Sequence, residues 1–152
     1  MDNNFDVIVI GSGPGGYVCA IRAAQLGLKT ACIESRKTLG GTCLNVGCIP
    51  SKSLLNSSEI YHKAQKEFGN LGIETSKIKL NLLKMMQNKN QSVSTLTKGI
   101  EFLFKKNKVT YLKGKGTIID QNTLSVSNDE KKIKYKTKNI VIGTGSIPTS
   151  LP

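Results

Sequence analysis

The sequence predicts an α/β domain in which helices cover a parallel sheet and a small antiparallel β-meander follows. Three observations support this fold class. A short apolar run near the N-terminus leads directly into a glycine-rich turn. The helix predicted after that turn leads into a second apolar run, which completes a βαβ unit with a right-handed crossover. The last third of the chain changes to short strand-like runs separated by Gly, Asn and Asp.

The βαβ unit begins with the run FDVIVI at residues 5–10. A continuous apolar run rich in β-branched residues is typical of a strand buried on both faces. Residues 17–27 contain good helix formers, with Gly27 where the helix would end, and residues 29–34 form the second strand. The apolar side chains at helical spacing, expected on the core side of the helix, are Val18, Ile21, Ala24 and Leu28.

The remaining elements are two helices and several strands. A helical pattern covers residues 48–65, and a longer, more polar one covers about 77–106. One face of the second helix carries Val93, Leu96, Ile100 and Leu103. The strand-like runs are 108–114, 116–120, 123–127, 132–138 and 139–145. The chain stops just after a strand and a glycine turn, which suggests a truncated domain.

Length and composition fit one ordinary soluble domain. The 152 residues are 38% hydrophobic and 21% charged, so the chain is globular rather than disordered. No apolar run approaches the roughly 20 residues that cross a bilayer, and no basic region precedes the first apolar run as in a secretory signal. We therefore expect a protein kept inside the cell, either in a bacterial cytoplasm or in a mitochondrial matrix, with no membrane partner.

The formal net charge of +12 raises nucleic acid as a partner. The lysines are scattered, however, and neither an RNP-like aromatic motif nor zinc-finger spacing accompanies them. A solvated basic surface is the better interpretation, and a longer chain could carry the balancing acids. We expect no nucleic-acid partner.

Gly11, Gly13 and Gly16 form a G-x-G-x-x-G motif between the first strand and the helix. The first glycine permits a tight turn, the second lets the main chain approach a pyrophosphate, and the third lets the helix pack closely on the strand. The helix N-terminus adds unpaired N–H groups and a partial positive charge. This context predicts a Rossmann-like phosphate cradle.

Glu34 ends the second strand, where a carboxylate can accept hydrogen bonds from the ribose hydroxyls of an adenosine. Alone it would be a solvated strand end. Together with the glycine turn it predicts an adenine dinucleotide. A carboxylate disfavours a 2′-phosphate and hence NADP, whereas NAD and FAD both remain.

The four cysteines do not suit a zinc site. Structural zinc needs four ligands, usually in two close pairs, and the chain has only one histidine, His62, beside its cysteines. Cys19 and Cys32 fall on the apolar sides of the first helix and second strand, where thiols act as small hydrophobes. No metal site is predicted.

Cys43 and Cys48 lie five positions apart. In a straight helix that spacing puts Cα atoms about 8.7 Å apart, whereas a disulfide requires less than about 7 Å. A bridge therefore needs irregular backbone, which Gly47 can supply. Cys48 would then begin a helix, where a thiolate is stabilised, with Lys52 one turn further on. Lasting structural disulfides are rare inside cells, so the pair indicates a redox dithiol, and two unrelated buried cysteines are the alternative.

The segments GSGPGG (11–16), Glu34, GGTCLNVGCIPSK (40–52) and GTGS (143–146) together resemble the flavin-dependent pyridine nucleotide–disulfide oxidoreductases. Residues 40–64 and 96–109 most resemble the members that serve 2-oxo acid dehydrogenase complexes. The resemblance implies FAD as cofactor, NAD as co-substrate, lipoyl domains as partners and a homodimer of the full-length enzyme. It also implies that residues 1–152 are an N-terminal FAD-binding domain, incomplete and lacking the NAD-binding and dimerisation domains, which by itself does not turn over.

The same resemblance assigns the site residues. Cys43 is the interchange thiol that meets the lipoyl sulfur, Cys48 is the thiol next to the flavin, and Lys52 lies near the reactive edge of the ring. His62 is not the acid–base histidine of the family and is expected at the surface. Gly143 stands where alanine is usual, which should loosen the strand end. The implied cofactor-binding residues are Gly11, Gly13, Pro14, Gly15, Gly16, Glu34, Ser35, Gly41, Thr42, Cys43, Lys52, Gly116, Thr144, Gly145 and Ser146.

Two rival functions remain open at this point. One is a sibling enzyme such as a glutathione or mercuric reductase. The other is a non-catalytic fragment that binds a partner through its basic surface. Flavin occupancy and the choice of disulfide substrate distinguish them.

Overall fold

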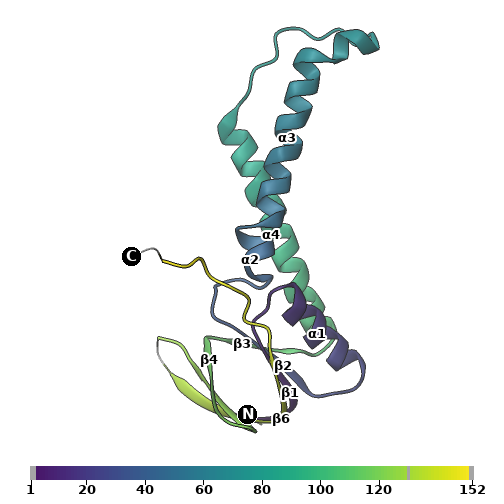
Figure 1. Ribbon diagram of the computed structural model, residues 1–152. Helices are drawn as coiled ribbons and strands as arrows, with labels where there is room; N and C mark the ends of the chain where they lie inside the picture. The colour runs from purple at the N-terminus through teal and green to yellow at the C-terminus, as the bar shows by residue number, and fades with distance from the viewer. Residues whose placement is uncertain (1–2, 130, 151–152) are drawn as a thin grey trace.

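The structure is a computed structural model that describes residues 3–129 and 131–150. Helices pack on one face of the sheet that forms its base, and two long helices project beyond it (Figure 1). The elements follow in the order β1 (Asn4–Ile10), α1 (Pro14–Gln25), β2 (Thr30–Glu34), α2 (Gly41–Asn45), α3 (Cys48–Lys66), the 3₁₀ turn η1 (Phe68–Leu71), α4 (Leu82–Lys106), β3 (Thr110–Lys113), β4 (Lys115–Asp120), β5 (Thr123–Ser127) and β6 (Lys132–Ile142).

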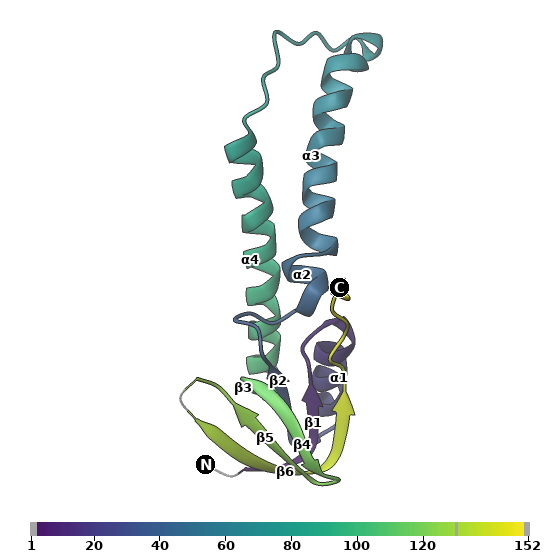
Figure 2. The same cartoon turned by 60° about the vertical axis from the view of Figure 1, so that its left-hand side comes forward.

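The six strands form one mixed sheet in the order β3-β2-β1-β6-β5-β4. β1 pairs in parallel with β2 and β6, and β2 pairs in parallel with β3. The β4, β5 and β6 strands are antiparallel neighbours and form the meander (Figure 2). The predicted fold class, a parallel sheet with helices plus an antiparallel meander, is therefore confirmed.

The last two predicted strand runs are one continuous strand. β6 spans 11 residues. Its first part, 132–136, pairs with β5, and its second part, 136–142, pairs with β1. The meander and the parallel sheet therefore share a strand, because no glycine or proline interrupts the run from Lys132 to Ile142.

The first apolar run is buried on both sides, as predicted. Val7 and Val9 join a cluster with α1, α2, α4 and the middle of β2, while Ile8 and Ile10 join a second cluster with the meander. Successive side chains of a strand point to opposite faces, so an uninterrupted apolar run serves two cores at once.

Helix α1 contacts the sheet through small side chains. Gly16 and Ala20 are its buried residues, whereas Val18 is 55% exposed and Leu28, beyond the helix end, is 41% exposed. The predicted core face was wrong at those two positions, because the close approach at Gly16 turns Val18 outward and Leu28 lies beyond the end of the helix. Gly27, at φ +87°, follows the helix and ends it as predicted.

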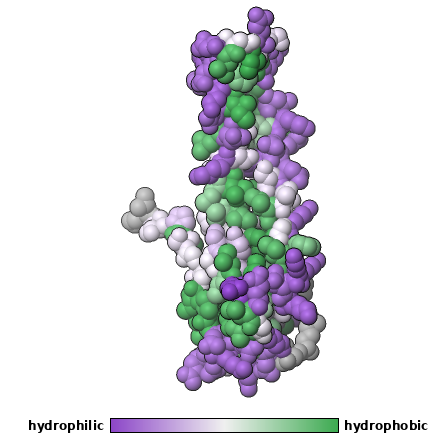
Figure 3. Space-filling view, turned by 90° about the vertical axis from the view of Figure 1, so that its right-hand side faces the viewer, coloured by the Kyte–Doolittle hydropathy of each residue, from purple (hydrophilic) through white to green (hydrophobic). Residues whose placement is uncertain are grey.

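Helices α3 and α4 run side by side and project far from the sheet (Figures 1 and 2). α4 begins at Leu82, later than predicted, because Asn81 caps it by accepting a hydrogen bond from the Lys84 N–H at 3.0 Å. Its buried residues include Ile100, as predicted, but Leu96 and Leu103 are exposed. Apolar side chains lie along the length of this hairpin between polar ones (Figure 3).

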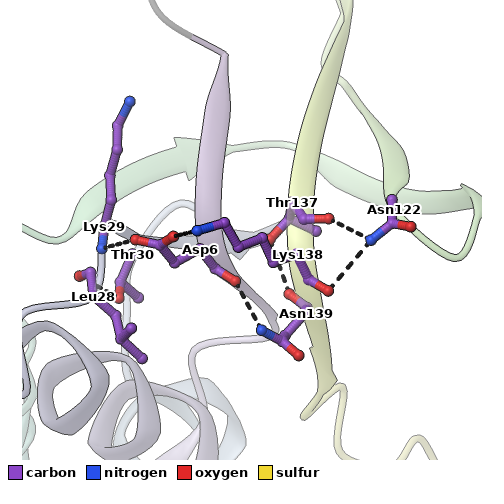
Figure 4. A network of polar contacts seen from close by, with 8 residues as sticks. All are labelled: Asp6, Leu28, Lys29, Thr30, Asn122, Thr137, Lys138 and Asn139. Atoms are coloured by element: carbon purple, nitrogen blue, oxygen red, sulfur yellow. Dashed lines mark hydrogen bonds and ion pairs between the residues drawn. The ribbon is translucent and has the colours of Figure 1, made fainter.

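A polar network ties the start of β1 to its neighbours (Figure 4). The Asp6 carboxylate accepts hydrogen bonds from the Lys29 N–H and from Lys138 Nζ, each at 2.8 Å. Asn139 Nδ2 donates to the Asp6 carbonyl at 3.2 Å. Asn122 Nδ2 donates to the Thr137 carbonyl at 2.9 Å. These contacts fix both edges of β1 in register.

In the part of the chain that the structure describes, none of the helices is both long and apolar enough to cross a membrane.

Candidate nucleotide and dithiol site

A pocket of about 430 Å³ lies beyond the carboxyl ends of β1, β2 and β6. In open parallel sheets this is the edge at which ligands bind. Seven of the twenty lining residues are glycines, which expose main-chain N–H groups that a ligand could bind. Its lining residues are Ile10, Gly11, Ser12, Gly13, Pro14, Ile33, Glu34, Ser35, Arg36, Gly41, Thr42, Cys43, Gly114, Lys115, Gly116, Gly143, Thr144, Gly145, Ser146 and Ile147.

Two of the three motif glycines, Gly11 and Gly16, take the structural roles that their spacing predicts. Gly11 has φ +98°, and a Cβ there would lie 2.2 Å from the Gly143 carbonyl oxygen. A Cβ on Gly16 would lie 1.9 Å from the Gly11 carbonyl oxygen, so this glycine packs the helix against the turn. A Cβ on Gly13 would meet nothing within 4 Å. The backbone at Gly13 is therefore open to a ligand, at the point where α1 begins.

Glu34 is buried at this edge and accepts four hydrogen bonds. It is 7% exposed. Its Oε2 accepts from the Ser12 N–H at 3.1 Å and the Ser12 Oγ at 2.7 Å. Its Oε1 accepts from the Arg36 N–H at 2.8 Å and the Ser35 Oγ at 3.4 Å. Burial acts to raise the pKa of Glu34, but these donors outweigh burial and hold that pKa below its ordinary value. The site thus keeps a carboxylate ionised beside the pocket.

The segment that carries the cysteines docks on the glycine turn. Gly40, at φ +102°, caps α2, and its N–H donates to the Ser12 carbonyl at 2.9 Å. A Cβ on Gly41 would lie 2.5 Å from Gly13 Cα. The two glycine-rich turns are therefore in direct contact, and this contact brings Cys43 of α2 to the pocket.

Cys43 and Cys48 meet across the break between α2 and α3. α2 ends at Asn45 and α3 begins at Cys48 itself, with Gly47 at its N-cap. The predicted irregular backbone is therefore present. The side-chain hydrogen bond between the two thiols, together with desolvation, raises the pKa of Cys43. All four cysteines are thiols in this structure.

The two cysteines differ in their surroundings. Cys43 is half-buried and lines the pocket, while Cys48 is exposed and lies outside the lining. Lys52 is also exposed and outside the lining. It lies one turn beyond Cys48 on α3, and its charge acts to lower the pKa of Cys43, against the larger effects that raise it. The assignment of Cys48 and Lys52 to the flavin ring stays a prediction.

The turn after β6 and the start of β4 close the pocket. The Gly143 N–H donates to the Ile10 carbonyl at 2.8 Å. A Cβ on Gly143 would make only ordinary contacts, the nearest at 3.5 Å, so alanine would fit here. Gly116 lies against Ile10 and Ile33, with a Cβ contact of 3.2 Å at the nearest atom. Both glycines expose main chain to the pocket.

The structure brings most predicted site residues together and leaves four outside. Those in the lining are Gly11, Gly13, Pro14, Glu34, Ser35, Gly41, Thr42, Cys43, Gly116, Thr144, Gly145 and Ser146. Those outside are Gly15, Gly16, Cys48 and Lys52. His62 is exposed on α3, as expected. Among the described residues no group of three His, Cys, Asp or Glu side chains could hold a metal ion.

Sequence reasoning missed three polar lining residues, Ser12, Arg36 and Lys115. Ser12 occupies a variable position of the glycine motif, so the spacing gives it no role. Arg36 follows Glu34 by two positions, and its guanidinium donates to Thr42 Oγ1 at 3.2 Å. Proximity to Glu34 in the sequence was the one signal that could have indicated it.

Comparisons with known proteins agree on one family. The sequence model of the family described as pyridine nucleotide-disulphide oxidoreductase matches residues 5–152. The chain is 57% identical over 148 residues to the mitochondrial dihydrolipoyl dehydrogenase of Pisum sativum, covering 97% of this chain and 30% of that protein. It is 59% identical over 148 residues to a leghemoglobin reductase of Vigna unguiculata, covering 97% and 28% respectively.

The fold has a matching solved structure. The flavoprotein disulfide reductase RclA of Escherichia coli, solved as a Cu(II) complex, superposes with a TM-score of 0.79 at 26% sequence identity. The match covers 99% of this chain and 30% of RclA. The chain thus spans about 30% of the length of the proteins that it resembles.

Proposed function

The chain belongs to the pyridine nucleotide-disulphide oxidoreductase family, and on this premise we propose that it forms the FAD-binding, dithiol-bearing part of a dihydrolipoamide dehydrogenase. The observation that carries the proposal is the direct packing of the Cys43 segment on the phosphate cradle at Gly13 and Gly41. This contact holds a reactive dithiol beside a dinucleotide pocket. The high identity to dihydrolipoyl dehydrogenases supports this choice within the family.

The residues present fit FAD. The open backbone at Gly13 and the N-terminus of α1 suit its pyrophosphate, and the ionised Glu34 suits the diol of its ribose. The turn at Thr144–Ser146 and the main chain at Gly116 complete the lining. When bound, the flavin supplies two-electron transfer between the dithiol and NAD.

The dithiol chemistry of this chain is thiol–disulfide exchange. In the oxidised enzyme a thiolate of dihydrolipoamide attacks the Cys43 sulfur of the Cys43–Cys48 disulfide, and Cys48 leaves as a thiolate. The second thiol of the substrate then attacks the substrate sulfur that is bonded to Cys43, which closes the lipoamide ring and releases the Cys43 thiol. One substrate dithiol is oxidised and one enzyme disulfide is reduced.

The wider role follows from the same resemblance. We propose lipoyl domains of 2-oxo acid dehydrogenase complexes as partners, NAD as the final acceptor and a homodimer as the working form. Residues 1–152 then form the N-terminal FAD-binding domain. Several relatives are named as mitochondrial proteins, which favours a mitochondrial matrix over a bacterial cytoplasm.

The test is stoichiometric reduction of the purified, FAD-loaded protein. One equivalent of dihydrolipoamide should consume the disulfide, so that two further thiols per chain react with an alkylating reagent, and mass spectrometry should locate them at Cys43 and Cys48. Glutathione is the matched comparison and should be much slower. Preferential exchange with glutathione would instead assign a glutathione reductase, and a protein that takes up no flavin would refute the proposal.

A further inference from the structure

Ser12 has more buried polar contacts than its place in the glycine motif requires. It is 0% exposed. Its hydroxyl donates to Glu34 Oε2 at 2.7 Å and accepts from the Gly40 N–H at 3.3 Å. Its N–H donates to the same Glu34 oxygen, and its carbonyl accepts from the same Gly40 N–H. One residue thus links the glycine turn, the end of β2 and the start of α2, the helix that carries Cys43 and is called the cysteine helix below.

These contacts form a directed chain. The Gly40 N–H donates to the Ser12 hydroxyl, and that hydroxyl donates to the ionised Glu34. Hydrogen bonds in such a chain polarise one another, and those that end on a charge are the stronger ones. Because all three groups are buried, water does not compete with them.

From this geometry we infer that Ser12 is a positioning residue of the proposed flavin site, which couples the ribose-binding carboxylate to the cysteine helix. This inference rests on the proposed function. The hydroxyl orients Glu34 and keeps it ionised for a ribose diol, and it holds Gly40 at the N-cap of the helix that carries Cys43. A single side chain therefore affects both how tightly the nucleotide binds and how firmly the dithiol segment is held.

The alternative is that Ser12 is only a small residue that fits a tight turn. The pH dependence of FAD affinity separates the two roles of Ser12, because only the coupled role changes the titration of Glu34. Two ionisable groups near Glu34, Cys32 and Tyr111, stay uncharged across the acid range. Cys32 and Tyr111 have their pKa values raised to about 12 by burial. The Arg36 guanidinium donates to Thr42 Oγ1 and not to the Glu34 carboxylate.

The experiment compares the wild type with Ser12→Ala, and uses Ser125→Ala as the matched control. Ser125 is 2% exposed on β5 and lies outside the pocket lining, so this control also removes a buried hydroxyl. FAD affinity of the apoprotein is titrated between about pH 3 and pH 7, so that the range extends below the ordinary pKa of a glutamate. Amide hydrogen exchange is followed in the peptide covering residues 40–45. Ser12→Ala should weaken FAD binding about tenfold at pH 7, the loss expected for a hydrogen bond to a charged group.

The pH profile gives the sharper readout. Glu34 binds a diol as the carboxylate, so affinity falls as the pH falls through its pKa. Removing the Ser12 hydroxyl should raise that pKa. The fall in FAD affinity at low pH, which we call the acid limb, should therefore move to higher pH. Ser12→Ala should also speed exchange at 40–45, and Ser125→Ala should change neither quantity.

Failure of the inference differs from failure of the proposed function. The inference would be overturned, and the function left intact, if Ser12→Ala kept the FAD affinity, the pH dependence of that affinity and the amide exchange rate of the wild type. If the wild type binds no FAD, the function fails, and unchanged exchange at 40–45 in Ser12→Ala would then overturn the coupling as well. If Ser12→Ala does not fold, Glu34→Gln replaces it. That variant should abolish the acid limb and speed exchange at 40–45, and unchanged exchange would overturn the inference.

Discussion

Gly16 lies so close to Gly11 that a Cβ on Gly16 would be 1.9 Å from the Gly11 carbonyl oxygen. That contact holds α1 against the end of β1 and fixes the turn between them. The neighbouring Gly15 is the natural comparison, because a Cβ there would meet nothing within 4 Å.

We expect Gly16→Ala to abolish flavin binding and to destabilise the fold, because the added methyl meets main chain that cannot move away. Gly15→Ala should be neutral or stabilise the helix by up to about 1 kcal/mol, since alanine is the better helix former. Urea denaturation and FAD titration of both variants give the comparison. Equal losses of stability and of FAD affinity in the two variants would show that the close approach at Gly16 is not required for the fold or for flavin binding.

Asp6 should contribute to stability in a pH-dependent way. Hydrogen bonds from Lys138 and from the Lys29 N–H lower its pKa (Figure 4). A carboxyl group whose folded pKa is depressed stabilises the fold above its unfolded pKa, and that contribution disappears as the pH falls through the folded value. Asp6→Asn should therefore melt at a lower temperature than the wild type at pH 7, and the difference should shrink toward pH 3. Lys138→Ala should have the smaller effect at pH 7, because Asp6 keeps the Lys29 N–H. A difference that stays constant down to pH 3 would contradict this.

Cys43 should titrate above the ordinary range for a thiol in the reduced protein, because its side chain is hydrogen-bonded to Cys48 and partly desolvated. The rate of its alkylation should therefore rise with pH to a midpoint above about 8.5. Cys48→Ala removes the hydrogen bond and should move that midpoint down. Peptide mass spectrometry after timed iodoacetamide treatment measures the rate at each site. Cys19→Ala is the control, and a shift of the same size in that variant would count against the Cys48 contact.

Tyr111 has a buried hydroxyl without a hydrogen-bond partner among the described residues, and burial raises its pKa to about 12. Tyr111→Phe should be neutral or stabilise the protein, because a buried unsatisfied group costs about 1–3 kcal/mol. It should also remove the last step of the tyrosinate absorbance titration. Phe104, which packs edge-on against the Tyr111 ring, gives the contrast, since Phe104→Ala should cost about 3–5 kcal/mol. A clear loss of stability in Tyr111→Phe would reveal a partner for the hydroxyl.

The parts of the fold that were predicted correctly depend on local patterns of apolar residues and glycines in the sequence. The run at 5–10 and the glycines after it specify a strand, a turn and a helix within one short segment, and the structure contains all three. The break at Gly47 followed from the geometry of the cysteine spacing, and it is also present. The family assignment from the same motifs agrees with the comparisons.

What the sequence did not reveal depends on contacts between distant segments. Ser12 acquires its role only where the glycine turn, β2 and the cysteine helix meet. Val18 and Leu96 looked like core residues by periodicity, but packing selected a neighbouring face of each helix. Cys48 and Lys52 lie outside the pocket lining, because the lining reaches α2 and not the outer side of α3.

The strand shared by the meander and the parallel sheet also has a consequence for the order of folding. β1 lies between β2 and β6, and its partner Lys136 is more than a hundred positions away from Asn4 in the chain. During synthesis one edge of β1 therefore stays unpaired until the segment up to Ile142 has left the ribosome. Such long-range pairing is slow and leaves an apolar edge available for aggregation. A nascent chain of this protein should therefore depend on a chaperone until β6 has emerged, and the meander and the nucleotide cradle should then form together in one cooperative step.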